Sequence, residues 1–331
     1  MKIGTIGTGF ITDWVMGQML EYEENTYEAI YSRKVETAAF LSEKYHVEKV
    51  YTDLDQMLKD KDIDTIYVAS PNSMHAKHAI MAMKAGKNVI LEKPFASNVK
   101  ECEELIQISK ETNQFLFEAI TTIYNPNFNE IKKQIEKIQP IRFVECNFSQ
   151  YSRKYDAYLE GKNPNVFTTK YSGGALMDLN IYNIHYVVGL FGMPSEVIYH
   201  SNLEENGIDI SGVLIMKYKD FITSLIASKN SIGTTFAQIQ GEKGSIYTEG
   251  PSSKMKSLDV TIRGGEDYSI DLQHRDSTHY FYTGEMMRII KENDHKKCNE
   301  MLEHSLNVMK VIDMAKKSAG IIFDADYNQM N

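Results

Sequence analysis

Glu92 and Lys93 stand directly after the short apolar run Val89-Ile90-Leu91 and directly before Pro94. A short apolar run that is stopped by a proline is typical of a strand buried on both faces of a parallel sheet. In an open α/β sheet, ligands bind outside the carboxyl ends of the strands, so this charge pair would face a cleft. Lys93 is therefore the first candidate for chemistry. The alternative is an ordinary surface lysine in a loop.

A second stretch, residues 172–185, reads as a mostly apolar helix opened by Gly173 and Gly174. Asp178, Tyr182 and His185 are spaced by four and then three residues, so they share one stripe of that helix. A carboxylate, a phenol and an imidazole on a buried helix need one another or a ligand to offset their desolvation. They are candidates for substrate binding, and a structural hydrogen-bond network is the alternative.

A turn near the N-terminus could position a dinucleotide. Strand-like residues 1–6 precede Gly7-Thr8-Gly9 and a helical pattern. Two glycines let the backbone bend tightly and approach a pyrophosphate, whose charge is favoured by the free N–H groups of a helix start. Thr12 stands in place of the usual third glycine or alanine, so the motif alone is a weak signal. We expect the cofactor to contact Gly7, Gly9, Phe10 and Ile11.

The residues after the second strand distinguish NAD from NADP. A carboxylate at that point binds the ribose 2′-hydroxyl and repels a 2′-phosphate. This chain has Ser32-Arg33-Lys34 there, and an arginine can hold a phosphate with two N–H groups. Ser32 and Arg33 therefore favour NADP, with NAD still possible. A solvated turn is the alternative for Arg33 and Lys34.

The turn at residues 70–75 follows another predicted strand and leads into a helix, with Ser73 as a possible cap. Asn72 could contact the nicotinamide ribose, and neither Asn72 nor His75 is assigned a catalytic role. The residues that we expect at this edge of the cofactor site are Ser70, Pro71, Asn72, His75, Glu92 and Lys93.

Strand and helix patterns alternate through the first part of the chain, which predicts a Rossmann domain with a doubly wound parallel sheet. The predicted strands are 1–6, 28–31, 65–69, 89–91 and 115–119, and the predicted helices after the first are 35–45, 74–85 and 99–112.

The pattern changes after Ala119 to strand-like runs joined by short turns, which predicts a C-terminal α+β domain with a large, mostly antiparallel sheet. The predicted strands are 141–148, 213–218, 221–227, 235–240, 245–248, 258–262 and 268–272, and the predicted helices are 127–138, 280–292 and 299–318. We expect residues 1–120 to form an NAD(P)-binding domain and residues 121–331 to form a domain for substrate binding and oligomerisation.

The amino-acid composition limits the classes of protein to which this chain could belong. The 331 residues are 42% hydrophobic and 24% charged, as in globular proteins, and the net charge of −9 argues against nucleic acid as a partner. The 3 cysteines form no CxxC pair, so we expect no metal site and a reducing, cytoplasmic location. We expect no membrane span, because no stretch reaches about 18 apolar residues. One face of the antiparallel sheet could meet a second subunit, so we expect a homodimer or homotetramer.

The order of the motifs carries a family resemblance. With the glycine turn, the Ser-Pro-Asn-x-x-His turn, Glu92-Lys93-Pro94 and the run Gly173 to Asp178, the chain resembles the glucose-fructose oxidoreductase and inositol dehydrogenase family (Gfo/Idh/MocA) over nearly its whole length. Tyr182 at the position after Asp-x-x-x is more similar to the dihydrodiol dehydrogenase and NADP-xylose dehydrogenase branch than to the inositol dehydrogenases. The chain departs from the family pattern at two places. Thr12 replaces the third glycine of the turn, and residues 121–124 stand where relatives often carry an arginine.

The resemblance implies a dehydrogenase that transfers hydride between nicotinamide and a hydroxyl or carbonyl carbon of a sugar, polyol or diol. Such a reaction needs a base, and Tyr182 is our hypothesis for it. The Lys93 ammonium would lower the pKa of this phenol, Asp178 would orient Lys93 or a second hydroxyl, and His185 is the competing base. The alternative functions are an NAD-dependent glycoside hydrolase and a non-catalytic, cofactor-sensing binding protein of the same fold.

Overall fold

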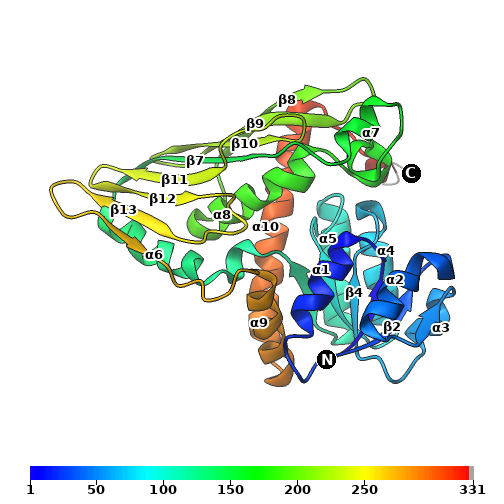
Figure 1. Cartoon of the computed structure of the whole chain (residues 1–331). Coiled ribbons are helices and arrows are strands. Elements are labelled where there is room, and N and C mark those ends of the chain that lie inside the picture. The colour runs from blue at the N-terminus through cyan, green and yellow to red at the C-terminus, as the bar shows by residue number, and fades with distance from the viewer. Residues whose placement is uncertain (328–331) are drawn as a thin grey trace. The chain divides into compact units, whose positions relative to one another are not determined.

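The computed structural model describes residues 1–327 and divides into two compact units (Figure 1). Unit 1 contains Met1–Ala119 and His279–Leu306. Unit 2 contains Ile120–Thr278 and, within the described part of the chain, residues 307–327. The segment 279–306 therefore belongs to the same compact unit as the predicted Rossmann domain.

Unit 1 is built on a six-stranded sheet in which every neighbouring pair is parallel, in the order β3-β2-β1-β4-β5-β6. This is the strand order of a Rossmann fold, in which the direction of winding reverses between β1 and β4. The predicted doubly wound sheet is confirmed. The strands are β1 (Lys2–Ile6), β2 (Thr26–Tyr31), β3 (Lys49–Tyr51), β4 (Thr65–Val68), β5 (Asn88–Glu92) and β6 (Leu116–Ala119).

The helices of unit 1 follow these strands. Strand β3 and the short helix α3 were not predicted, because three and five residues are too few for a periodic pattern to show. The prediction that Ser73 caps a helix is wrong, since Ser73 lies inside the 3-10 turn η1 (Asn72–Met74) and α4 begins at His75. The helices are α1 (Phe10–Met19), α2 (Val35–Tyr45), α3 (Leu54–Leu58), α4 (His75–Lys84), α5 (Val99–Thr112) and α9 (His279–Lys291). Helix α10 (His295–Ala319) belongs to unit 1 as far as Leu306.

Helix α9 completes unit 1 by packing on α1. The rings of Tyr22 and Tyr280 stack with centroids 4.5 Å apart, and the Tyr22 hydroxyl donates to the Tyr280 carbonyl. Trp14 donates from its indole nitrogen to His279 at 3.3 Å. Gly284 leaves room for this packing, because a Cβ there would lie 2.3 Å from the Tyr22 hydroxyl.

Unit 2 is built on an eight-stranded sheet in the order β14-β13-β12-β11-β7-β10-β9-β8. Only β10 and β7 run parallel among its neighbouring pairs, so the predicted mostly antiparallel sheet is confirmed. The strands are β7 (Ile141–Ser149), β8 (Glu196–Leu203), β9 (Asp209–Lys217), β10 (Ile222–Ser228), β11 (Phe236–Gly241), β12 (Gly244–Glu249), β13 (Leu258–Ile262) and β14 (Tyr268–Ile270).

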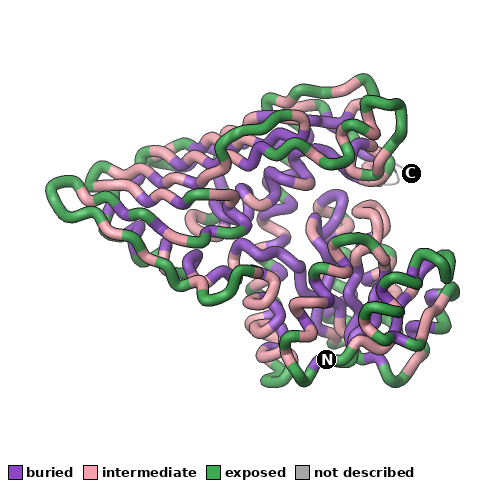
Figure 2. Tube along the Cα trace, viewed as in Figure 1, coloured by how far each residue is buried: buried purple, intermediate pink, exposed green. Residues whose placement is uncertain are grey.

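Helices cover one face of this sheet. Figure 1 shows α6 (Pro126–Ile138) and α8 (Ile181–Phe191) beneath the strands, and burial alternates along β9 and β10 as expected for a sheet with one covered face (Figure 2). Shorter pieces connect these elements, namely η2 (Thr122–Tyr124), α7 (Tyr155–Leu159), η3 (Asn165–Phe167), η4 (Thr169–Tyr171), the π-helix η5 (Leu176–Asn180) and α11 (Asp324–Tyr327).

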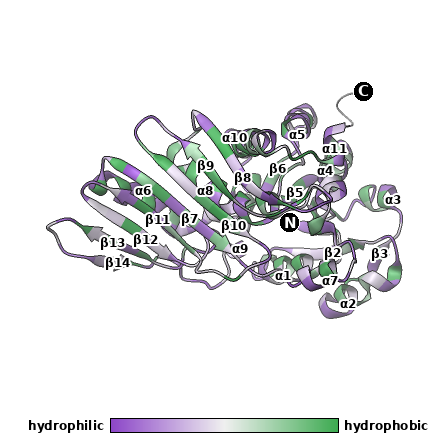
Figure 3. Ribbon diagram, turned by 90° about the horizontal axis from the view of Figure 1, so that it is seen from above, coloured by the Kyte–Doolittle hydropathy of each residue, from purple (hydrophilic) through white to green (hydrophobic). Residues whose placement is uncertain are grey.

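The opposite face of the sheet carries a row of aliphatic side chains. In register, Ile198 on β8 lies beside Ile215 on β9, and Val213 on β9 lies beside Ile226 on β10. These side chains alternate with the buried residues of the same strands, and Figure 3 shows hydrophobic stretches along β8, β9 and β10.

None of the helices within residues 1–327 combines the length and apolarity needed to cross a membrane.

Candidate active site

The glycine turn after β1 has the geometry that a close backbone approach requires. Gly7 has a φ of +119°, and a Cβ there would lie 2.5 Å from the Ala69 carbonyl oxygen at the end of β4. Gly9 begins α1 with ordinary φ, and apart from its chain neighbours no atom of residues 1–327 lies within 4 Å of an ideal Cβ there. Gly7 is thus needed by the fold. Gly9 instead leaves open space at the start of α1, where a pyrophosphate would fit.

Thr12 occupies the position of the third glycine in the fingerprint. Its side chain is fully buried, and its Oγ1 atom has no hydrogen-bond partner among the described residues. The third glycine serves close packing of helix on strand rather than contact with the cofactor. The threonine therefore departs from the motif at a packing position and leaves the turn itself intact.

The end of β2 presents the residues expected to read the ribose. Ser32 is buried, its N–H donates to the Tyr51 carbonyl at 3.0 Å, and its hydroxyl is hydrogen-bonded to Thr37 on α2. Arg33 follows with an exposed side chain. Ser32 and Thr37 therefore hold the turn, and Arg33 is the residue with the reach and charge to meet a phosphate.

The turn at residues 70–75 is clamped to the Lys93-Pro94 segment by His75. Its ring is buried, with Nδ1 2.8 Å from the Pro94 carbonyl oxygen and Nε2 2.8 Å from the Ser70 carbonyl oxygen. Burial lowers the pKa of His75, and the two carbonyl acceptors oppose that change. His75 was predicted to contact the cofactor, and its ring contacts two backbone carbonyls in the structure. Asn72 lies in the same turn and is half-buried.

Glu92 is the last residue of β5, which lies beside β4, and Lys93 comes directly after it. Gly7, Ser70 and Lys93 therefore follow the carboxyl ends of three neighbouring strands. Val89, Ile90 and Leu91 are fully buried, as predicted for the run before them. Glu92 is buried and accepts a hydrogen bond from the Tyr67 hydroxyl on β4, while Lys93 is half-buried. Burial raises the pKa of Glu92 to about 7, although the Tyr67 hydrogen bond and the Lys93 charge lower it.

Unit 2 contributes the second set of predicted residues. Gly174, before η5, makes room for Asp209, because a Cβ on Gly174, whose φ is +101°, would lie 1.9 Å from the Asp209 Oδ1 atom. The buried Asp209 carboxylate accepts from the Leu176 N–H at 2.7 Å and from the Tyr199 hydroxyl at 2.8 Å. Asp209 therefore fixes the start of the π-helix that carries Asp178. π-helical turns inside helices occur frequently at functional sites.

Asp178 is paired with a lysine that sequence analysis did not identify. The Lys229 ammonium, directly after β10, bonds the Asp178 Oδ2 atom. Lys229 belongs to no motif. The signal that could have found it is its place directly after a buried strand, which is the argument that identified Lys93.

Tyr182 and His185 lie on α8 beyond the π-helix, in different surroundings. Tyr182 is half-buried against a small apolar cluster, with its ring centroid 5.7 Å from that of Phe148. His185 is completely buried. Of the two candidate bases, Tyr182 has the more accessible side chain.

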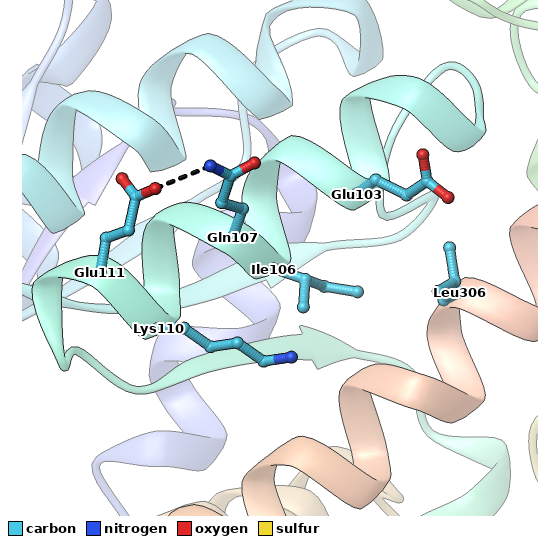
Figure 4. A pocket seen from close by; sticks show the side chains of 6 residues that line it. All are labelled: Glu103, Ile106, Gln107, Lys110, Glu111 and Leu306. Atoms are coloured by element: carbon cyan, nitrogen blue, oxygen red, sulfur yellow. Dashed lines mark hydrogen bonds between the residues drawn. The ribbon is translucent and has the colours of Figure 1, made fainter.

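An open groove of about 320 Å³ lies elsewhere on unit 1, between α5 and α10 (Figure 4). Gln107 and Glu111 on its rim are hydrogen-bonded to each other. None of its lining residues is among the predicted site residues. They are Glu103, Ile106, Gln107, Lys110, Glu111 and Leu306.

Comparison with known proteins shows to which protein family the chain is related. Residues 1–120 match the model described as "Oxidoreductase family, NAD-binding Rossmann fold", and residues 128–247 match the model of the GFO/IDH/MocA C-terminal domain. Scyllo-inositol 2-dehydrogenase (NADP(+)) IolU of Bacillus subtilis is 34% identical over 326 residues, which is 98% of this chain and 99% of that protein. Trans-1,2-dihydrobenzene-1,2-diol dehydrogenase of Xenopus tropicalis is 30% identical over 263 residues, which is 77% of this chain and 76% of that protein.

A solved structure with the same fold is the 3-ketoreductase KijD10 of Actinomadura kijaniata in complex with TDP-benzene and NADP. It aligns with a TM-score of 0.83 and 20% identity over 96% of this chain and 98% of that one. The family models, the relatives that match along most of the chain and the Rossmann sheet with its glycine turn show that this chain belongs to the Gfo/Idh/MocA family of NAD(P)-dependent oxidoreductases.

Proposed function

We propose that this protein is an NADP-linked dehydrogenase that transfers hydride between the nicotinamide and a hydroxyl or carbonyl carbon of a sugar, polyol or diol. The observation that carries the substrate class is the match to the inositol and dihydrodiol dehydrogenases along most of the chain. Both of those relatives are named for substrates with neighbouring hydroxyl groups.

The local structure of unit 1 fits the cofactor. The open space at Gly9, the first turn of α1 and the exposed Arg33 offer a place for a pyrophosphate and a 2′-phosphate. The remaining cofactor contacts that we propose are Gly7, Phe10, Ile11, Ser32, Ser70, Pro71, Asn72, His75, Glu92 and Lys93. When bound, the nicotinamide supplies the hydride acceptor or donor, which no side chain can provide.

We assign the proton chemistry to Tyr182, with Lys93 and Asp178 as its partners on the substrate. Oxidation of a carbinol requires that the hydroxyl proton leave as the hydride departs, and a phenol can accept it only if a nearby cation lowers its pKa from about 10. Lys93 is the proposed cation. Asp178 would accept a hydrogen bond from a substrate hydroxyl, and the complete burial of His185 supports Tyr182 as the base.

The proposal also covers the roles of the two parts of the chain, its oligomeric state and its location. Residues 1–120 would bind the cofactor, and residues 121–331 would bind substrate and a second copy of the chain. The aliphatic row on the open face of the unit 2 sheet supports a homodimer or homotetramer. A cytoplasmic location is supported by the three cysteines, which are buried and form no disulfide among the described residues.

Steady-state turnover on a panel of polyols, sugars and diols, followed by the absorbance of the reduced nicotinamide with NADP and with NAD, tests the function. Tyr182→Phe should lower kcat by at least about 100-fold, which is the usual contribution of a positioned acid or base. The matched control is Tyr186→Phe. Tyr186 lies one turn further along α8, and its buried hydroxyl has no hydrogen-bond partner within the described part of the chain. An undiminished rate for Tyr182→Phe would refute the assignment of the base.

A further inference from the structure

Lys229 is a buried cation inside unit 2. Its side chain is 2% exposed, whereas the Asp178 carboxylate that it bonds is 30% exposed. The Lys229 Nζ also lies 5.2 Å from the centre of the Phe167 ring, which is fully buried on η3. The lysine is thus buried against Asp178 and Phe167, and of these three side chains only the aspartate retains appreciable contact with solvent.

The backbone of Lys229 is held on both sides. Its N–H donates to the Ile210 carbonyl on β9 at 2.8 Å, and its carbonyl accepts from the Ser152 N–H at 2.8 Å. The ammonium therefore projects from a rigid point between β9 and the loop that follows β7. A lysine held in this way can fix the direction of a carboxylate, which a freely rotating surface lysine cannot do.

The charge of Lys229 also acts on a second carboxylate, that of Asp209. Burial raises the pKa of Asp209, and the charge of Lys229 opposes that rise. The hydrogen bonds from Leu176 and Tyr199 favour the charged form of Asp209 most, and the Lys229 charge adds a smaller contribution to the residue that starts the π-helix. Removal of the lysine would take away the ammonium that bonds the partly buried Asp178 carboxylate, which is an unfavourable change.

We propose that Lys229 is a positioning residue, which keeps Asp178 ionised and aimed so that it can accept a hydrogen bond from a substrate hydroxyl. This inference rests on the proposed function, because Asp178 needs a fixed direction only if it meets a substrate. It assigns Lys229 no contact with the reacting atoms. An ionised Asp178 accepts hydrogen bonds and does not donate them, so it would favour substrates that present a hydroxyl to it.

The test is a double-mutant cycle on kcat and KM with Lys229→Met, Asp178→Asn and the double variant. Lys229→Met should lower kcat/KM by at least about tenfold, equivalent to about 1.4 kcal/mol, and should raise the substrate KM. In the D178N background the same substitution should change kcat/KM by less than about twofold, because its effect runs through Asp178. Lys229→Arg should recover part of the loss.

The matched control is Lys316→Met. Lys316 is also buried in unit 2, pairs with Asp326 at 3.0 Å and lies 4.5 Å from the centre of the Phe323 ring. A loss that reflected only a smaller folded fraction would lower the apparent kcat of both variants and leave KM unchanged. Additive losses in the cycle, or a wild-type KM in Lys229→Met, would overturn the inference.

Failure of this inference is distinguishable from failure of the proposed function. Absence of turnover by the wild-type protein on the whole panel would refute the function, whereas wild-type kinetics in Lys229→Met would refute only the role of Lys229. If Lys229→Met does not fold, the double variant, which carries no uncompensated charge at Asp178, and Lys229→Arg supply the comparison. A Lys229→Arg variant that folds but is no more active than Asp178→Asn would also overturn the inference.

Discussion

Gly7 and Gly9 belong to one motif, yet the structure gives them different tasks. Gly7 is required by backbone conformation and by the Ala69 carbonyl, while Gly9 faces open space. Gly7→Ala should destabilise the protein by more than about 1 kcal/mol, because alanine is strained at positive φ. Gly9→Ala should leave the melting temperature unchanged or slightly raised, yet weaken NADPH binding, since its Cβ would occupy the space above the helix start. Differential scanning fluorimetry and fluorescence titration of NADPH check the pair. Unchanged NADPH affinity in Gly9→Ala would contradict the placement of the pyrophosphate.

Glu92 should make stability depend on pH. Its pKa is raised from 4.5 to about 7 by burial, so the folded state retains the proton over a range in which the unfolded state has lost it. The stabilisation is therefore complete below pH 4.5, and the free energy of unfolding should fall by about 3 kcal/mol as the pH rises to about 7.

The comparison that isolates this effect is wild type against Glu92→Gln, by urea unfolding between pH 4.5 and pH 8. Histidines with lowered pKa values, such as His75, act in the opposite direction and cancel in the difference. Glu130→Gln is the control, because hydrogen bonds from Lys133 and Gln134 lower the pKa of Glu130. Identical pH dependence of wild type and Glu92→Gln would show that Glu92 does not titrate in this range.

At the scale of elements, α5 shows how a helix fixes the segment after Lys93. The Asn98 side chain accepts from the Glu101 N–H at 3.0 Å, and the Glu101 carboxylate accepts from the Ser97 N–H at 2.9 Å. The arrangement is similar to a capping box, except that Glu101 accepts from the N–H of the residue before the N-cap. It ties the start of α5 to the chain that leaves β5.

Asn98→Ala should therefore lower the free energy of unfolding by about 1–2 kcal/mol, as expected for the loss of an N-cap. Urea denaturation measures the change, with Lys100→Ala, an exposed position in the same first turn, as the control. Equal stability of the two variants would mean that the cap contributes nothing to the helix.

At the scale of the molecule, the aliphatic row on the open face of the unit 2 sheet allows the proposed assembly to be tested. Ile215→Lys should convert a homodimer or homotetramer into smaller species, because it places a charge in the centre of the aliphatic row beside Ile198. Thr261→Lys, on β13 of the same sheet, is the control for added charge. Sedimentation velocity distinguishes the outcomes, and a monomeric wild-type protein would refute the proposed assembly.

Local patterns in the sequence predicted most of the helices and strands. The alternation of residues 1–119 predicted the Rossmann sheet, and the runs between 213 and 262 predicted most strands of the second sheet, because burial on one or both faces imposes a periodic pattern on the sequence. Elements too short to show a period, β3 and α3, were missed. The motif residues were found because glycines, prolines and strand-terminal charges are rare and position-specific.

Only the tertiary structure revealed which groups each candidate residue meets. Nothing near Asp178 in the sequence indicates Lys229, since the two are separated by 51 residues and meet because β10 ends beside the π-helix. The same holds for Tyr67 on Glu92, for the two carbonyls on His75, and for Asp209 beneath Gly174. Sequence periodicity reports how deeply a side chain is buried, whereas its partner depends on which distant strands and turns the fold brings beside it.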